Sequence, residues 1–205
     1  MIDRREFIAI SVASFAHARA RSTTPLRIAA VLEDPANDEA LGFEFGLLEA
    51  RRTASLLGWD VAHARDVREA HALIVASAGV SSHAEAPVLR IRHDGEHTPD
   101  GSFCLGADAP DRTAWHGALE RFGAQQLNDR YRRAIRKDMS GDAWTAWFAV
   151  KIVTDSALRL RSNDPARLLA HLGSADAHFD GHKGVPLRFD STRHLVQPLY
   201  DPPVR

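Results

Sequence analysis

The sequence holds a single cysteine, Cys104, and has no excess of charge of either sign. One cysteine excludes an intrachain disulfide, a CxxC redox pair and every zinc or iron–sulfur site that needs several thiolates. With 26 basic and 27 acidic side chains, the chain lacks the strongly basic character of proteins that wrap nucleic acid or adhere to anionic lipid. We therefore expect packing to stabilise the fold, and we expect no nucleic acid as a partner.

The motifs of covalent and nucleotide chemistry are also missing. The chain contains no G-x-S-x-G nucleophile elbow, no G-x-x-x-x-G-K-[ST] phosphate loop and no G-x-G-x-x-G dinucleotide motif. Cys104 stands between Phe103 and Leu105, which favours an inert buried thiol over a nucleophile. The sequence thus predicts a protein that is not an enzyme and that carries no cofactor.

The N-terminal segment is organised like an export signal. Arg4 and Arg5 precede an apolar run to Phe15, and residues 16–20 supply an A-x-A cleavage pattern. This run is shorter than the roughly 20 apolar residues that span a bilayer, and no later stretch approaches that length, so membrane embedding is not expected. The paired arginines resemble a twin-arginine signal, which predicts that residues 1–20 direct export to the periplasm. An ordinary amphipathic start is the alternative.

Short apolar runs separated by helix-forming or connecting segments predict the α/β class, with a mostly parallel sheet flanked by helices. A segment with apolar residues at helical spacing follows the first run; Asn37 or Asp38 can cap it and Gly58 can end it. Gly42 and Gly46 lie one turn apart in this segment, which allows another backbone to approach closely. The four runs expected to form strands are Leu26–Leu32, Trp59–Ala64, Ala72–Ser77 and Pro87–Arg92.

The second half of the chain changes to a helical pattern. Residues 93–113 are polar and turn-rich, apart from Phe103–Leu105, and form either a loop with a short strand or a hinge. A helix is expected from Thr113, with Trp115, Leu119 and Phe122 on one face.

Two further helices and a ribbon complete the expected fold. A helix that is apolar on most sides starts near Ser140, and Asp164–Pro165 and Gly173 bracket a short one. Alternating residues from Val185 to Phe189, followed by Leu195–Tyr200, predict a C-terminal β-ribbon. We therefore expect one α/β lobe over 21–205, with strand–helix units in 21–103 and returning helices and the ribbon in 113–205.

Five segments together carry a resemblance to a known family: Leu41–Ala50, Trp115–Leu127, Ala143–Trp147, Phe179–Phe189 and Gln197–Leu199. They resemble type I periplasmic substrate-binding proteins of ABC transporters, in the branch associated with PQQ-dependent alcohol dehydrogenase systems. The resemblance implies a Rossmann-like fold, a periplasmic location and a small-molecule solute as ligand. It also implies a PQQ-dependent dehydrogenase or an ABC transporter component as partner.

Members of that family are longer and have two α/β lobes that close around a ligand. Here the stretch that would build most of the second lobe is missing, between Phe103 and about Trp115, which predicts a single lobe. A cleft without its opposite wall cannot bury most of a small ligand's surface. Either a homodimer that places two half-clefts face to face or docking on a partner protein would supply the missing wall.

Ligands of doubly wound sheets bind beyond the carboxyl ends of the strands. The resemblance implies that hydroxyls and backbone amides after the third and fourth strands touch the ligand. Small polar residues after a strand are also ordinary turn formers, so a purely structural role is the alternative. The residues expected to bind ligand are Glu33, Asp34, Ser77, Gly79, Ser81, Ser82, Arg92 and His93.

Two histidine clusters support a competing hypothesis, a small periplasmic metal-dependent enzyme that uses the first of them. Imidazole and carboxylate groups bind zinc, but neither spacing is the helical H-E-x-x-H pattern. That difference favours surface histidines and no metal site. The clusters are His93, Asp94 and His97, and His178 and His182 around Asp180.

Aromatic and basic side chains in the second half also allow two interpretations. Trp144 and Trp147 lie one helical turn apart, which is more typical of a core stripe than of a platform for a planar ligand. The basic run Arg130–Lys137 is more typical of a solvated helix end than of a surface for an anionic partner.

Overall fold

The computed structural model describes residues 24–76, 86–91, 101–107, 109 and 111–202 of the chain. The expected export segment, residues 1–20, lies outside them and stays a prediction.

Five parallel strands form the central sheet, in the order β2-β1-β3-β4-β5. Every residue of β3 is buried, as expected for an apolar strand that is covered on both faces. The predicted α/β class with a parallel sheet is therefore confirmed. The strands are β1 (Leu26–Val31), β2 (Val61–His63), β3 (Ala72–Val75), β4 (Val88–Arg90) and β5 (Phe103–Cys104).

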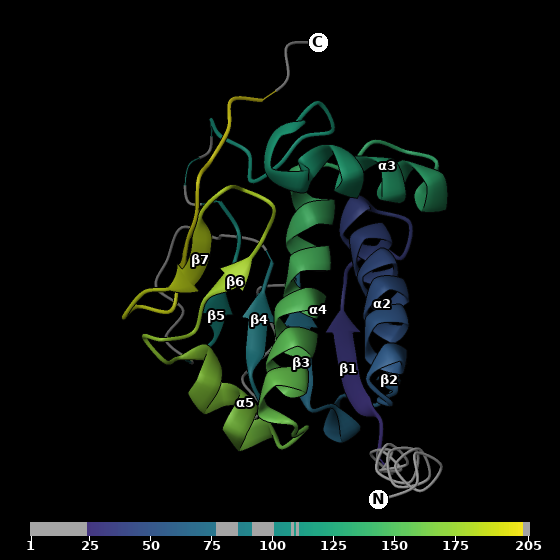
Figure 1. The fold of residues 1–205 in the computed structure, drawn as a ribbon, viewed down its shortest axis with the longest axis vertical. Helices are drawn as coiled ribbons and strands as arrows, with labels where there is room; N and C mark the ends of the chain where they lie inside the picture. The colour runs from purple at the N-terminus through teal and green to yellow at the C-terminus, as the bar shows by residue number, and fades with distance from the viewer. Residues whose placement is uncertain (1–23, 77–85, 92–100, 108, 110, 203–205) are drawn as a thin grey trace, which may run out of the picture.

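The helices α2 and α4 lie side by side across one face of this sheet (Figure 1). The main core fills the space between them and the strands. No helix in the described part of the chain is long and apolar enough to cross a membrane. The helices are α2 (Asp38–Leu56), α3 (Ala124–Ile135), α4 (Gly141–Leu160) and α5 (Pro165–Leu172), with 3₁₀ turns η1 (Val67–Glu69) and η2 (Arg121–Gly123).

Three of the helices begin at the caps that the sequence predicted. The side chains of Asn37, Ser140 and Asp164 accept hydrogen bonds from first-turn backbone N–H groups of α2, α4 and α5, at 2.9, 3.2 and 2.8 Å. Such caps satisfy donors that have no partner within the helix. Pro165 occupies the first turn of α5 and Gly173 follows its end, as predicted.

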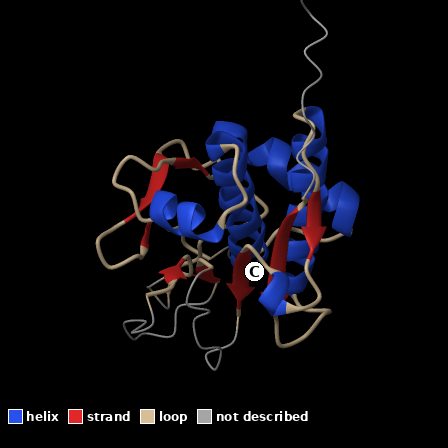
Figure 2. Cartoon of the chain, turned by 90° about the horizontal axis from the view of Figure 1, so that it is seen from below, coloured by secondary structure: helices blue, strands red, loops and turns tan. Residues whose placement is uncertain are grey.

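The predicted β-ribbon is a three-stranded antiparallel sheet beside β5, at the left in Figures 1 and 2. The backbone N–H of Cys104 donates to the carbonyl of Arg193 at 2.9 Å, which joins the small sheet to the edge of the large one. The strands are β6 (Phe179–Asp180), β7 (Pro186–Phe189) and β8 (Leu195–Val196).

The prediction of a helix from Thr113 is wrong, because α3 begins only at Ala124. Gly123 has a left-handed backbone (φ 85°), which stops a helix from running continuously through this point. Trp115 lies in the core without belonging to a helix, and its Nε1 donates to Oδ1 of Asn128 at 2.8 Å. Of the three apolar residues that suggested the helix, Trp115 is buried, Leu119 is partly buried and Phe122 is exposed, so they do not share one buried face.

Glycine brings α2 and α4 into backbone contact. A Cβ atom added at Gly42 would lie 2.1 Å from the carbonyl oxygen of Ala143, and one at Gly46 would lie 2.9 Å from Cβ of Val150. Both distances are shorter than any van der Waals contact. The close approach expected from the Gly42–Gly46 spacing therefore occurs, and α4 is the helix that approaches.

Replacing Gly42 by alanine tests this contact. We expect the Gly42→Ala variant to lose about 1–3 kcal/mol of unfolding free energy, because the new methyl group pushes two packed helices apart. Urea unfolding of both proteins measures the difference. A matched control is Gly173→Ala, where a Cβ atom would lie 3.6 Å from its nearest neighbour and should change the free energy by less than about 0.5 kcal/mol. Equal stability of the Gly42→Ala variant and the original protein would contradict the proposed tight contact.

Candidate functional site

A hollow of about 330 Å³ lies at the carboxyl ends of β4 and β5, where α4 begins. We call it the edge hollow. Ile91 follows β4, Gly106 and Ala107 follow β5, and Gly141 and Asp142 belong to the first turn of α4. Open parallel sheets bind their ligands beyond the carboxyl ends of their strands. The edge hollow thus lies at the edge of the sheet where the sequence predicted a site, and the described residues that line it are not among the eight predicted ones.

The polar groups of the edge hollow are held in place by local contacts. Oγ1 of Thr145 donates to the carbonyl of Gly141 at 2.8 Å, and the hydroxyl of Thr113 bonds to the carbonyl of Trp115 at 2.9 Å. Arg112 lines the hollow and forms an ion pair with Asp201. The guanidinium group and both hydroxyl groups are thus engaged within the protein, and Asp142 adds a carboxylate to the lining. The feature that favours an oxygen-rich ligand is the amino end of a long helix.

Two of the eight residues expected to bind ligand are described by the structure. Glu33 and Asp34 are exposed after β1, and Oδ1 of Asp34 accepts a hydrogen bond from the backbone N–H of Ala36 at 2.8 Å. This bond belongs to the turn that leads into α2, and neither carboxylate lines the edge hollow. The six others lie outside the described residues and stay predictions: Ser77, Gly79, Ser81, Ser82, Arg92 and His93.

The second histidine cluster does not come together. His178 is exposed and lines a different hollow from His182, whose ring stacks on Trp147 at 5.9 Å between ring centres. Within the described ranges, no three His, Cys, Asp or Glu side chains are placed to hold a metal ion. The first cluster, His93, Asp94 and His97, lies outside those ranges.

The aromatic stripe of α4 belongs to the core, as predicted. Trp144 is fully buried and stacks on Trp115, with 5.7 Å between ring centres. Nε1 of Trp147 donates to a carboxylate oxygen of Glu49 at 3.1 Å, so its polar atom is satisfied within the protein. Cys104 is also buried, as its apolar neighbours predicted.

The sequence analysis did not predict a second group of hollows around the β6–β7 turn, residues 178–186. One, of about 440 Å³, lies between α2 and α4 and reaches His182. Four of its charged side chains form two pairs: Nε of Arg130 lies 2.6 Å from a carboxylate oxygen of Glu49, and Lys151 pairs with Asp155. The partial burial of Arg130 in this pair corrects the prediction that the whole basic run is solvated.

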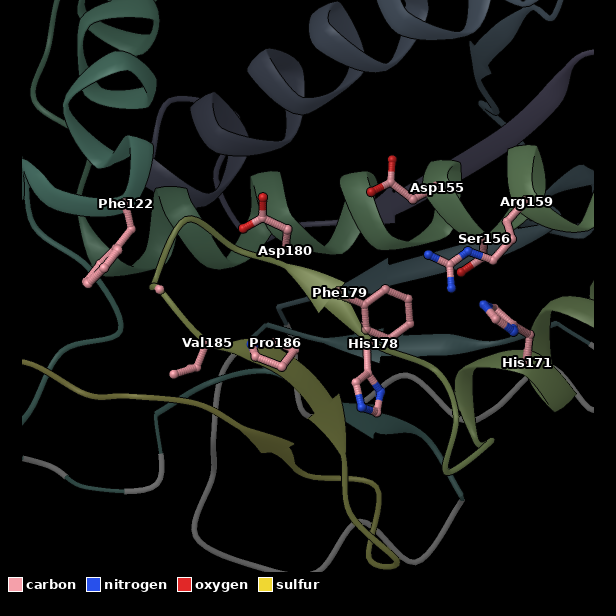
Figure 3. Close-up of a pocket in the computed structure, with 11 residues that line it drawn as sticks. Phe122, Asp155, Ser156, Arg159, His171, His178, Phe179, Asp180, Val185 and Pro186 are labelled. Atoms are coloured by element: carbon pink, nitrogen blue, oxygen red, sulfur yellow. The ribbon is translucent and has the colours of Figure 1, made fainter.

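A further hollow of about 430 Å³ lies between α4, α5 and the same turn (Figure 3). We call it the helical hollow. Apolar side chains from the turn and from η2 line one part of it, and polar side chains of α4 and α5 line the other. One sequence signal for this turn was available, because Gly181 and Gly184 lie close together. Gly184 has φ 77°, and a Cβ atom there would lie 2.6 Å from the ring of Phe122.

Lys183 anchors the turn from inside the protein. Its Nζ donates to Oε1 of Gln197 at 2.6 Å and to the carbonyl of Pro198 at 2.9 Å, and it lies 4.0 Å from the ring centre of Trp144. The side chain is almost completely buried, and this burial lowers the pKa of Lys183 to about 7.

A scan against protein-family models and a search of curated proteins both find no match. Solved structures with a similar fold include a branched chain amino acid ABC transporter periplasmic ligand-binding protein from Burkholderia xenovorans. It is 13% identical, with a TM-score of 0.39, over 86% of this chain and 52% of that one. An ABC transporter substrate-binding protein from Desulfitobacterium hafniense, in complex with Leu, is 13% identical, with a TM-score of 0.38, over 94% and 59%.

A leucine binding protein from Thermotoga maritima is 12% identical, with a TM-score of 0.33, over 97% of this chain and 61% of that one. The present chain thus spans about half to three fifths of the length of these proteins. At these scores the similarity is weak and concerns the fold alone, so the site and the function rest on this chain's own residues.

The buried ammonium group predicts a pH dependence of stability. The pKa of Lys183 falls from 10.5 to about 7 on folding, so between these values the unfolded chain binds a proton that the folded chain does not. The free energy of unfolding should therefore rise as the pH increases from 7 to 9, by up to about 1 kcal/mol for each pH unit. Urea unfolding at pH 7, 8 and 9 measures this rise.

The Lys183→Met variant should show a smaller rise over the same range, because it has no group to titrate. The exposed Lys137→Met variant serves as the control and should keep the original slope. If the Lys183→Met variant and the original protein show the same slope, Lys183 is not the group responsible.

Proposed function

We propose that this chain is a non-catalytic, exported solute-binding protein that serves a PQQ-dependent alcohol oxidation system in the periplasm. The observation that carries solute binding is the edge hollow, which lies beyond the carboxyl ends of β4 and β5 and at the start of α4. The sequence segments that resemble type I substrate-binding proteins support the periplasmic location and the link to PQQ.

The edge hollow suits a small polar solute that carries an oxygen acceptor. The backbone N–H groups in the first turn of a helix have no intrahelical partner and carry partial positive charge. Arg112 adds a guanidinium group at the same place, where it is also paired with Asp201, and Asp142 adds a carboxylate. A volume of about 330 Å³ is near the lower end of the roughly 300–1,000 Å³ typical of small-molecule sites.

A single sheet lobe provides one wall of such a site. Type I relatives close a second lobe over the ligand, and the described residues of this chain form one parallel sheet and one small antiparallel sheet. We propose that a second copy of the chain or a partner protein covers the edge hollow. The candidate partners are a PQQ-dependent dehydrogenase and an ABC transporter component.

Native mass spectrometry of the protein isolated from the periplasm of its host tests two points together: whether a solute is bound, and whether a second copy or a partner protein covers the edge hollow. We expect a defined small mass that is retained by a dimer or by a complex with a partner. An Ala107→Trp substitution fills the edge hollow and should remove this mass, whereas Ala166→Trp on the exposed surface of α5 should retain it. An empty monomer would contradict solute binding and would leave docking on a partner as the mode of action.

Export has its own test at the paired arginines. We expect intact-mass measurement of the periplasmic fraction to find a chain that lacks residues 1–20. The double substitution Arg4→Lys and Arg5→Lys keeps the positive charge but removes the arginine pair that a twin-arginine signal requires, so the uncleaved chain should accumulate in the cytoplasm. Arg19→Lys in the same segment is the control and should leave export unchanged. Export of the double variant at the original level would exclude a twin-arginine signal.

A further inference from the structure

The helical hollow has a polar end and an apolar end. Figure 3 shows the guanidinium group of Arg159 and the imidazole of His171 facing each other at one end, with Ser156 beside them. Phe122, Val185 and Pro186 lie toward the other end of the view. The helical hollow lies beside the second half of α4, away from the edge hollow at the start of that helix. A ligand site in the helical hollow therefore does not depend on the proposed function.

The polar end holds one cationic side chain, Arg159, without a partner among the described residues. Its guanidinium group forms no hydrogen bond or ion pair with any of them. Nε2 of His171 is shielded from solvent and has no hydrogen-bond partner either. Burial and the charge of Arg159 lower the pKa of His171, so its imidazole is neutral at pH 7.

The apolar end exposes side chains that water solvates poorly. Phe122 and Val185 are 66% and 47% exposed and are among the large hydrophobic residues that reach the surface. Phe179 and Pro186 continue the same wall toward His171, whose ring packs edge-on against Phe179. An apolar chain or ring lying along this wall would cover the exposed surface.

The two carboxylates near the hollow are already engaged. Asp155 pairs with Lys151, and Oδ1 of Asp180 accepts a hydrogen bond from the backbone N–H of His182 at 2.8 Å. Both carboxylates also line the neighbouring hollow between α2 and α4. Lys151 neutralises Asp155, whereas Asp180 keeps its negative charge but lies away from Arg159 in Figure 3. Arg159 is therefore the cation available to an anionic group at the His171 end of the hollow.

We infer that the helical hollow binds a small monocarboxylate that carries an aliphatic or aromatic group. The carboxylate accepts hydrogen bonds from the guanidinium group of Arg159, and the apolar group lies against Phe179, Val185 and Phe122. Arginine binds carboxylates well because its donors form a planar fork. The volume of about 430 Å³ lies within the roughly 300–1,000 Å³ range of small-molecule sites.

Calorimetric titration of the full-length chain with octanoate at pH 7 tests this inference. We expect octanoate to bind at least about tenfold more tightly than 1-octanol or octylammonium, because only octanoate matches both ends of the hollow. Arg159→Gln and Val185→Asp each change an exposed side chain and should weaken octanoate binding by about tenfold or more. Arg167→Gln on the exposed face of α5 is the charge-matched control and should leave it unchanged.

The outcomes separate this site from the edge hollow. The Ala107→Trp variant should bind octanoate as tightly as the original protein does. If the Ala107→Trp variant instead lost octanoate binding while the Arg159→Gln variant kept it, octanoate would lie in the edge hollow. That result would overturn the present inference while leaving the proposed function intact. No measurable octanoate binding at millimolar concentration, or equally tight binding of octylammonium, would also overturn it.

Discussion

The contact between Gly42 of α2 and Ala143 of α4 determines where the rest of the molecule lies. A residue with a side chain does not fit at position 42, since a Cβ atom there would overlap the carbonyl of Ala143. Because the two helices meet at their backbones, they form one layer against the sheet, and Trp144 and Trp147 of α4 are enclosed within the protein. The position of α4 in turn places the amino end of this helix at the carboxyl edge of the strands.

The two hollows to which we assign ligands both use α4, but at different places along it. The edge hollow lies at its first turn, where the helix carries partial positive charge. The helical hollow lies beside its last turns, where Arg159 supplies a full charge from a side chain. Because the guanidinium group of Arg112 in the edge hollow is paired with Asp201, whereas that of Arg159 has no partner among the described residues, the two sites are expected to prefer different solutes.

Local patterns predicted the elements whose cause is local. Asn37, Ser140 and Asp164 cap their helices through side chains only a few residues away, and the apolar run of β3 is buried on both faces. The helix expected from Thr113 failed for a reason that is not local. Trp115 is buried because it stacks on Trp144 and donates a hydrogen bond to Asn128, not because it belongs to a helix. The left-handed backbone of Gly123 separates it from α3.

The sequence by itself determined the α/β class, the helix caps and the edge of the sheet at which to look for a ligand, because these follow from periodicity, capping and strand direction. Tertiary structure alone decided which residues meet there. Gly106 and Gly141 are far apart in the chain and line the same hollow, and His178 and His182 are close in sequence but line different ones. It also decided that His171 faces Arg159 across the helical hollow (Figure 3). These outcomes depend on how α4 and α5 pack in three dimensions, which no spacing along the chain encodes.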